Sequence, residues 1–546
     1  MKNNAWSEIT KTFDKWRYVK RPVLFVILGV LTALILFISI YFGLVPFNFY
    51  HGGFRTIVAI LLLIWSAPLF FVDKKDKTPF KKSWWQIPFY TAVAYIGVML
   101  ILTIGATPLF NAEAYRDLIS VHDNQSFASE VENYDTMQIP VVDKALAQKL
   151  GDKKLGEDNL GSQYNVGEYY MICHNDNLYW IAPIEFNGFF PWTNRRTSPG
   201  YVMINANDPA DVQIVKYELH YTDSSYLWED LNRQNYFGNM TAWRADEAHL
   251  ELTDTGEPRY VETVYVNRIG LTGGYDVAGI IITNPNTGES EYCDYLQAPT
   301  WINHVITEEV IVDQLNYWGT YVNGFFNSIF AKKDVLEVST GINYVYSNGN
   351  MYLQTGMTSV GGDESIVGVM MVDMRTKEAF FYRIGGATEY AASQSAIGKD
   401  QEKRYASSDP IMINLDGVPT YFIMLKDDEG LVKRYAYVNV SDYRLVSTAE
   451  TKTSALIEYK KLIQVESQTP AEEYEIADIR QVIIGGNTVY YLKLKATATT
   501  PSDWENFVFS APIELDPTLP FKKAGDKIKI RYEYNNGLYE ISSIEK

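Results

Sequence analysis

The sequence predicts an α+β protein: a large body of repeated antiparallel hairpin, strand and helix units, preceded by three transmembrane helices and followed by a small β-barrel. Three observations lead to this prediction. Long apolar runs fill the first 110 residues, one strand–turn–strand pattern recurs through the middle of the chain, and short alternating strands fill residues 471–546. The 546 residues are enough for three or four domains of about 100–200 residues each.

The apolar runs near the start are long enough to cross a membrane. Residues 22–44 and 85–109 carry no charge, whereas residues 54–72 include Arg55, whose long side chain can reach the membrane interface. A helix needs roughly 20 apolar residues to span a bilayer core. We therefore expect three transmembrane helices at about 22–44, 54–72 and 85–109; two spans with one re-entrant segment are the alternative. The first run exceeds the apolar core of a signal peptide, about 7–15 residues, so we expect a retained anchor.

The charge distribution predicts the orientation in the membrane. Residues 1–110 carry 12 Lys and Arg against 4 Asp and Glu, whereas the remainder carries 36 against 62. Basic residues that flank spans face the cytoplasm, and here they gather before the first run and between the second and third, at Lys2, Lys11, Lys15, Arg17, Lys20, Arg21, Lys74, Lys75, Lys77, Lys81 and Lys82. We expect a multi-pass cell-membrane protein with a cytoplasmic N-terminus and residues 110–546 outside the cytoplasm. The runs lack the internal ionisable groups typical of transport paths, which favours an anchor.

A polar connector, residues 111–165, separates the membrane part from the body. Residues 143–150 carry apolar positions at helical spacing and precede Gly151, so we expect a short helix that this glycine ends.

One pattern marks the body: a Gly or Ala, an apolar strand, an Asn or Asp, a turn and a returning strand. It begins at Gly200, Gly279, Gly368 and, in a degenerate form, Ala436. Its polar residues are Asn205, Asn284, Asp373 and Asn439, at spacings of 79, 89 and 66 residues. Asn and Asp favour turns because their side chains bond the backbone two residues on. Asp373 is therefore interpreted as a turn residue and not as a catalytic acid.

Other elements recur around the pattern. Hairpins with turn signals at residues 175–177, 348–349 and 416–417 precede three copies. Helical stretches follow all four, at residues 226–237, 308–330, 387–403 and 454–463. We expect four repeat units, 166–257, 258–335, 336–404 and 405–470; the alternative is a chance likeness between hairpins.

The segment Asn284–Glu289, Asn-Pro-Asn-Thr-Gly-Glu, resembles the strand–turn–strand of PepSY domains, a family of small α+β modules. Asp373–Glu378 keeps the Asp, Thr and Glu but lacks the Pro and Gly. The helix-before-sheet order of that family is not evident in the sequence. The resemblance implies a non-catalytic module that binds or restrains other envelope proteins, and it transfers no functional residue. The layout as a whole is similar to uncharacterised three-span envelope proteins of Gram-positive bacteria.

Residues 471–546 differ from the rest of the body. Strands separated by turn signals at Gly485–Asn487 and Asn535–Gly537 are similar to a small OB-type barrel. Its basic stretch, residues 522–531, is interpreted as the solvent face of an alternating strand; an anionic-ligand face is the alternative.

No sequence pattern points to catalysis, a cofactor or a metal. The six His lack zinc spacing, and no nucleophile elbow, phosphate loop or calcium loop occurs. Asp427–Glu429 is an acidic cluster before Gly430, typical of a solvated turn. Cys173 and Cys293 form a disulfide between the first two units or remain two free thiols.

These observations predict a membrane-anchored extracytoplasmic binding or scaffold protein of the bacterial cell envelope, not an enzyme, acting in an oligomer or a larger membrane complex. Its expected partners are the membrane and other envelope proteins or further copies of the chain. An acidic body does not suit nucleic acid. Two alternatives remain: an envelope hydrolase with a carboxylate-based site, and a subunit of a multi-chain channel or export machine.

Overall fold

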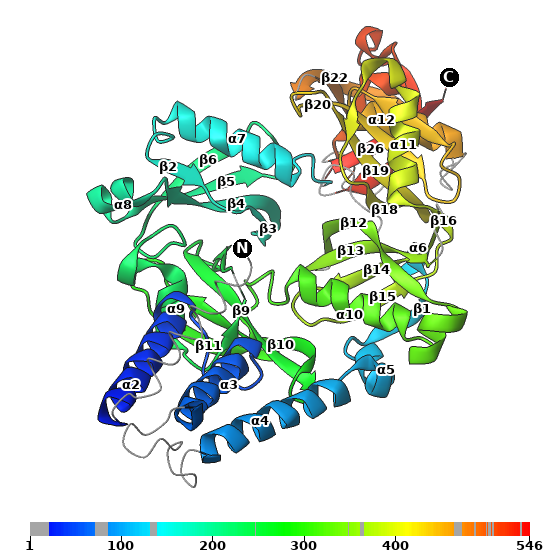
Figure 1. The fold of residues 1–546 in the computed structure, drawn as a ribbon. Coiled ribbons are helices and arrows are strands. Elements are labelled where there is room, and N and C mark those ends of the chain that lie inside the picture. Colours follow the sequence, from blue (N-terminus) through cyan, green and yellow to red (C-terminus); the bar gives the residue numbers. More distant parts are fainter. Residues whose placement is uncertain are drawn as a thin grey trace.

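The computed structural model describes residues 21–70, 86–131, 139–245, 247–347, 349–360, 365–463, 472–484, 487–497, 500, 504, 507–535 and 538–545. Three apolar helices lead into a body of sheets (Figure 1). They are α2, Arg21–Phe37, which continues as the π-helical η1, Ile38–Phe42; α3, Gly52–Ser66, followed by the 3₁₀ turn η2, Ala67–Phe70; and α4, Gln86–Gly105. Two stretches, Pro22–Phe42 and Gln86–Gly105, are long and apolar enough to cross a membrane.

The expectation of three spans is wrong for the middle helix, because α3 has only 15 residues, fewer than the roughly 20 that a bilayer core requires. Its first turn is fixed to the body: the Arg55 guanidinium donates to the Tyr50 and Leu271 carbonyls at 3.0 and 2.9 Å. The residues before it are also tied down, since the Phe47 amide donates to the Met240 carbonyl. Apart from Arg21, the basic residues used to predict orientation lie outside the described residues.

The body contains four sheets built from antiparallel neighbours, which confirms the α+β class. The first sheet holds β2 Tyr164–Val166, β3 Tyr170–His174, β4 Asn177–Phe186, β5 Ser198–Asn205 and β6 Val212–Leu219. The second holds β7 Trp243–Arg244, β8 His249–Leu252, β9 Pro258–Ile269, β10 Gly273–Thr283 and β11 Ser290–Asp294.

The third sheet includes a strand from the connector. It holds β12 Leu336–Ser347, β13 Asn350–Ser359, β14 Ser365–Asp373, β15 Ala379–Tyr382 and β16 Gly386–Ala387, and β1, Val121–Gln125, pairs in parallel with β15. The fourth holds β17 Ala406–Ser407, β18 Ile411–Leu415, β19 Val418–Lys426, β20 Val432–Asn439 and β21 Val446–Ala449. Three predicted hairpins are present: β3–β4, β12–β13 and β18–β19.

The helices predicted after the four copies of the pattern are present, and a helix also precedes each sheet. The helices that precede the sheets are α7 Lys144–Glu157, α9 Leu231–Gly238, α10 Glu308–Thr320 and α11 Glu389–Lys399. For example, α7 packs on β2, β5 and β6, and α11 packs on β19, β20 and β21. The last helix, α12, Lys452–Ile463, also contacts β20 and β21. Each sheet needs a helix over one face, because its apolar side chains must be buried.

Helix α7 does not stop at Gly151 but continues to Glu157. The glycine serves close packing, since a Cβ there would lie 1.7 Å from the Tyr169 hydroxyl. Its role is therefore to let α7 approach the residue that leads into β3.

The four Asn or Asp residues of the recurring pattern all form the predicted turn. The side-chain oxygens of Asn205, Asn284, Asp373 and Asn439 accept backbone N–H bonds from Asn207, Asn286, Arg375 and Asp442 at 2.8–2.9 Å. The carbonyl that follows each of them accepts from a segment ahead of the covering helix. Ala206 accepts from Val142, Pro285 from Tyr221, Met374 from Ile306 and Val440 from Ala387. The turn thus anchors the helix of the same sheet.

Exchanging Asp373 for Asn should change stability little, whereas Ala should cost about 2 kcal/mol. Asn keeps the oxygen that accepts from Arg375 and Thr376 and loses only the one that accepts from the Asn350 side chain, whereas Ala leaves all three donors without an acceptor. Urea unfolding of Asp373→Asn and Asp373→Ala measures the difference. A loss in Asp373→Asn as large as that in Asp373→Ala would show that the charge, not the turn, is required.

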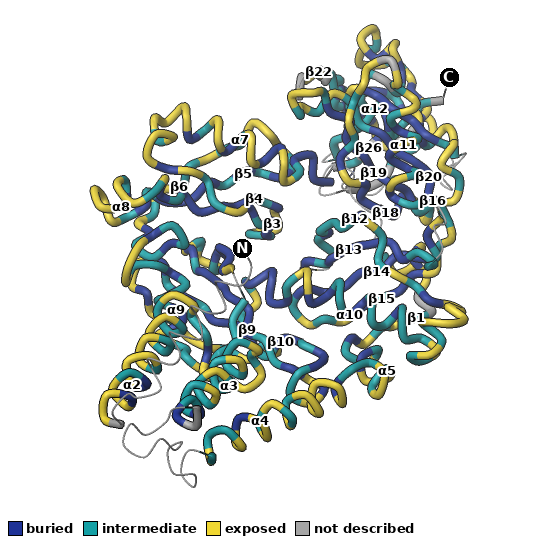
Figure 2. Tube along the Cα trace, in the orientation of Figure 1, coloured by how far each residue is buried: buried dark blue, intermediate teal, exposed yellow. Residues whose placement is uncertain are grey.

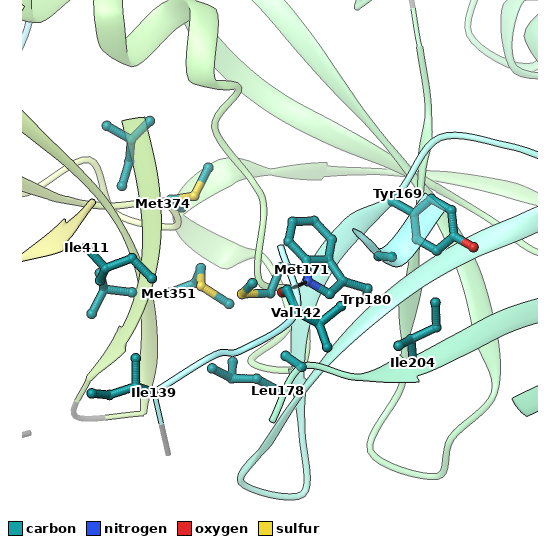
Figure 3. Close-up of a cluster of buried hydrophobic side chains, with 14 of the residues drawn as sticks. Ile139, Val142, Tyr169, Met171, Leu178, Trp180, Ile204, Met351, Met374 and Ile411 are labelled. Carbon is teal, nitrogen blue, oxygen red and sulfur yellow. Dashed lines mark hydrogen bonds between the residues drawn. The ribbon is translucent and has the colours of Figure 1, made fainter. Parts of the chain in front are cut away.

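The four sheets follow one another around the middle of the body in chain order (Figure 1). The last meets the first, because Lys426 pairs with Asp143 and the Lys149 ammonium donates to the Glu429 carbonyl. Inner side chains of several units share one core, in which Met171, Met351 and Ile411 lie near one another and the Trp180 indole donates to the Val142 carbonyl at 2.7 Å (Figure 3).

The C-terminal strands pair in a closed order, β22-β23-β24-β26-β25. Their bounds are β22 Glu472–Ile484, β23 Asn487–Leu494, β24 Phe509–Pro512, β25 Lys527–Asn535 and β26 Leu538–Glu545. Trp504 is buried in their core, and its indole donates to the Leu494 carbonyl. The predicted turns at Gly485–Gly486 and Asn536–Gly537 lie outside the described residues.

Candidate functional site

A cavity of about 620 Å³ lies between α7, the first sheet and the segments that enter the second sheet. Five carboxylate residues line it, and we call it the acidic cavity: Asp152, Glu168, Glu185, Asp223 and Glu247. They are far apart in sequence, on α7, before β3, on β4, after β6 and before β8. The tertiary fold therefore creates the cluster.

Close packing holds two of these side chains in place. A Cβ on Gly167 would lie 2.8 Å from the Glu185 carboxylate, so a glycine there lets β4 present this group. The Asp223 carboxylate accepts a hydrogen bond from the side-chain amide of Asn232 at 3.2 Å, which fixes Asp223 to the first turn of α9. Both carboxyl groups are thus set into the wall rather than on free side chains.

The carboxylates repel one another. Burial, together with Glu247 and Glu168, raises the pKa of Glu185 to about 7. Burial, together with Glu185 and other nearby acids, raises the pKa of Asp223 to about 8. Glu168 pairs with Lys144, but within the part of the chain that the structure describes no salt bridge involves Glu185, Asp223 or Glu247. The cavity therefore has a deficit of positive charge.

Buried polar atoms without hydrogen-bond partners surround the same space. They are the hydroxyls of Tyr169, which lines the cavity, and of Tyr260. Both residues are more than nine-tenths buried, and burial with the charges of Asp223 and Glu185 raises the pKa of Tyr260. Buried polar groups in proteins are normally satisfied. These atoms therefore indicate a site that takes a polar ligand.

The arrangement does not suit a metal ion. Among the described residues, no three His, Cys, Asp or Glu side chains converge closely enough to hold one. The carboxylates line a space of several hundred Å³, which suits a larger cation whose donor groups are spread over the cavity wall.

A second cavity, about 740 Å³, adjoins the first, because Tyr170 and Glu247 line both. It is rich in aromatic side chains, and we call it the tyrosine chamber: Tyr115, Tyr170, Trp243, Tyr265, Tyr275 and Tyr317. The rings of Trp243 and Tyr265 lie 5.7 Å apart, and Glu309 adds a further carboxylate. Aromatic faces beside carboxylates attract organic cations.

A buried acid supports the wall between the first and second sheets. Glu251 accepts from the backbone amides of Asn303 and His304 at 3.0 and 2.9 Å, and from the Asn303 side chain at 2.9 Å. Burial opposes its charge, but contacts with His249, His304 and Asn303 outweigh burial and lower the pKa of Glu251. His304 in turn lies 2.6 Å from the Met171 carbonyl. Glu251 thus positions His249 at the cavity.

The residues singled out in the sequence lie elsewhere. Cys173 and Cys293 are both free thiols, so the possible disulfide is not formed in the structure. The Cys173 amide is held by Asn303, whereas Cys293 lies on β11 and its thiol donates to the Asp294 carbonyl. Asp427 accepts from the Leu431 amide in a turn, as expected.

Sequence reasoning missed the acidic cavity, since its carboxylates follow no motif. Two signals were present: Glu168 beside the adjacent tyrosines 169 and 170, and the carboxylate of Glu185 within the otherwise apolar strand 180–186. A charged residue in a buried strand needs a partner or a function.

Comparisons with known proteins add no relative. No family model matches the chain, and no curated protein does. Among solved structures, a mutant apocarotenoid oxygenase from Synechocystis is 6% identical over 52% of this chain, with a TM-score of 0.13, and the match spans 54% of that protein. A mutant levansucrase from B. megaterium is 10% identical over 76% of this chain and 93% of its own, with a TM-score of 0.17. Such scores carry no functional inference.

Proposed function

We propose that the protein is a membrane-anchored binding protein of the cell envelope whose acidic cavity takes a cationic, amine-bearing ligand. The observation that carries the proposal is the acidic cavity, in which five carboxylate residues share one cation, Lys144, and adjoin two buried tyrosine hydroxyls without partners. The tyrosine chamber offers aromatic faces to the rest of the same ligand. In this proposal the two apolar helices of spanning length serve as the anchor, and the excess of Lys and Arg in residues 1–110 favours a body outside the cytoplasm.

A calorimetric titration of the full chain in detergent with spermidine, a flexible tricationic amine, tests the ligand class. A cation that enters the cavity lowers the pKa values of Glu185 and Asp223, so both release protons on binding at pH 7.5. The measured heat should then depend on the ionisation enthalpy of the buffer. Glu185→Gln/Asp223→Asn should weaken binding at least tenfold and remove the proton release.

The matched control is Glu291→Gln/Asp254→Asn, which removes the same charge from exposed positions of the second sheet. It should bind spermidine like the unchanged protein. Equal weakening in both variants, or binding without proton release, would mean that spermidine binds the acidic surface at large and would overturn the proposal.

A carboxylate-based hydrolase is the second candidate, because raised carboxyl pKa values also suit a general acid. However, the pKa values of Glu185 and Asp223 are raised together, whereas an acid and base pair needs values that are pushed apart. Hydrolysis of an envelope substrate that Glu185→Gln abolishes would favour the enzyme over the binding protein.

We also propose that the four sheets are copies of one unit. Three shared features support this proposal: the turn at the Asn or Asp, the carbonyl of the following residue, which accepts from a backbone amide ahead of the helix, and the helix ahead of each sheet. The closed order of β22–β26 supports an OB-like barrel. Repeated modules of this kind suit a scaffold protein. It would act in an oligomer, with other envelope proteins or as a subunit of an export machine.

A further inference from the structure

Exposed apolar side chains gather at two places on the body: one contacts the end of the first membrane-length helix, and the other follows a helix that packs on α5, shortly after the second. We call the first the α8 patch: Phe189 and Phe190 on α8, Phe189–Arg195, with Tyr226, Leu227 and Trp228 in and before the 3₁₀ turn η3, Leu227–Glu229. Phe190 is 78% and Trp228 63% exposed. The residues form one surface, since the Phe189 and Tyr226 rings lie 5.2 Å apart. Single exposed apolar residues are ordinary, but contiguous ones mark an interaction surface.

The α8 patch is continuous with the first membrane-length helix. The Trp228 ring lies 5.7 Å from the ring of Tyr41, in the last turn of Pro22–Phe42. The Arg233 guanidinium lies 4.5 Å over the Tyr41 ring and also donates to the Leu227 carbonyl. Figures 1 and 2 show α8, α9 and the body end of α2 along one side, with α8 and much of α2 exposed.

The backbone holds Leu227 outward at a cost. Its φ is +59°, in the left-handed region that a branched side chain avoids, yet the side chain is 51% exposed. Strain of this kind persists where surrounding contacts hold it and often marks a functional surface. Here the Arg233 guanidinium donates to the Leu227 carbonyl.

We call the second place the η5 patch: Phe326, Ile329 and Phe330, in and before the π-helical turn η5, Asn327–Ala331. Phe330 is 79% exposed, and its ring stacks on Phe326 at 6.4 Å. The patch follows α10, whose Tyr317 ring lies 5.0 Å from Tyr115 in α5, Pro108–Arg116, shortly after α4. It therefore follows a helix that packs on α5, the helix after the second membrane-length helix.

Basic side chains border both patches. Lys332 and Lys333 follow the η5 patch, and Arg195 and Arg196 end α8. Aromatic side chains favour the headgroup level of a bilayer, and nearby basic residues favour its anionic lipids. Because both patches lie close to the ends of the membrane-length helices, lipid can cover them without a protein partner.

We propose that the body docks on the outer leaflet of its own membrane through the α8 and η5 patches, so that lipid headgroups cover both. The proposal rests on the membrane anchoring proposed above and adds the surface that faces the bilayer. The body is then held at two points beside the helices, instead of standing away from the membrane on them.

Depth-resolved quenching tests the docking. The full chain, with Cys173 and Cys293 changed to Ala, receives one cysteine at a time for an environment-sensitive fluorophore: Leu227→Cys, Ile329→Cys, Leu431→Cys or Val98→Cys. All four positions are 43–51% exposed aliphatic residues; Leu431 lies beside β20, in the fourth sheet, and Val98 in α4. Each labelled protein is placed in nanodiscs of phosphatidylcholine and phosphatidylglycerol that contain a spin-labelled lipid.

Spin-labelled lipid should at least halve the emission at residues 98, 227 and 329 and leave residue 431 unchanged. If only residue 98 is quenched, α4 lies in the membrane but the patches do not contact lipid, which overturns the docking. No quenching at 98 overturns the anchor, and the docking with it. A protein partner would leave 227 and 329 unquenched in nanodiscs yet shielded from water-soluble quenchers in native membranes, which also overturns lipid docking.

Discussion

Glu251→Ala should lower the free energy of unfolding by about 3–5 kcal/mol, the cost of breaking a buried, hydrogen-bonded charge. Glu251 is fully buried, and its carboxylate accepts from two backbone amides and the side chain of Asn303. Removing it leaves these donors without an acceptor and also leaves His249 without the carboxylate 3.5 Å away. Glu251→Gln keeps one acceptor and should lose about half as much.

Hydrogen exchange with thermal unfolding measures this effect, because a chain of several units need not unfold in one step. In Glu251→Ala the amides of residues 302–306 and 249–252 should exchange at least tenfold faster. Glu291→Ala, an exposed acid on β11, serves as the control and should change stability by less than about 0.5 kcal/mol. A Glu251→Ala protein as stable as this control would mean that the buried charge does not join the first two sheets.

Glu185→Gln/Asp223→Asn should make the protein more stable than its parent at pH 9, by about 2–3 kcal/mol, and by less than half as much at pH 5. A carboxyl group whose folded pKa is raised favours the folded state below its ordinary pKa, about 4, and loses that contribution as pH rises through the folded value. The folded pKa values here are about 7 and about 8. A tenfold change in a protonation equilibrium corresponds to about 1.4 kcal/mol, and the expected gain is smaller than the sum for the two groups because both side chains keep contact with water.

Thermal unfolding at pH 5, 7 and 9 in low salt provides the measurement. The difference in melting temperature between variant and parent should grow steadily with pH, and 1 mM spermidine should reduce it by stabilising only the parent. The exposed pair Glu291→Gln/Asp254→Asn should follow the parent at every pH. A constant difference across the pH range would show that the acidic cavity is open to water and that its carboxylates are not coupled.

Local chemistry explains what was predictable in the fold. The turn residues Asn205, Asn284, Asp373 and Asn439 act within a few residues of themselves, and the hairpins at 175–177 and 416–417 depend on similarly short spacing. The two apolar helices of spanning length were predictable for the same reason, since composition alone sets them. By contrast, the contact of Arg55 with the Leu271 carbonyl, which ties the middle helix to the body, joins residues far apart in sequence and was not predictable.

The sequence by itself determined the α+β class, the turns and the long apolar helices, because periodicity and turn chemistry act over a few residues. Only the tertiary structure decided which sheet each helix covers, as when the Met374 carbonyl accepts from Ile306 ahead of α10. It also decided the candidate site, since Glu185 and Asp223 come from segments with no common motif and share a charge environment only after two sheets pack together. The repulsion between these carboxylates depends on the distance between them in space, which cannot be read from their positions in the sequence.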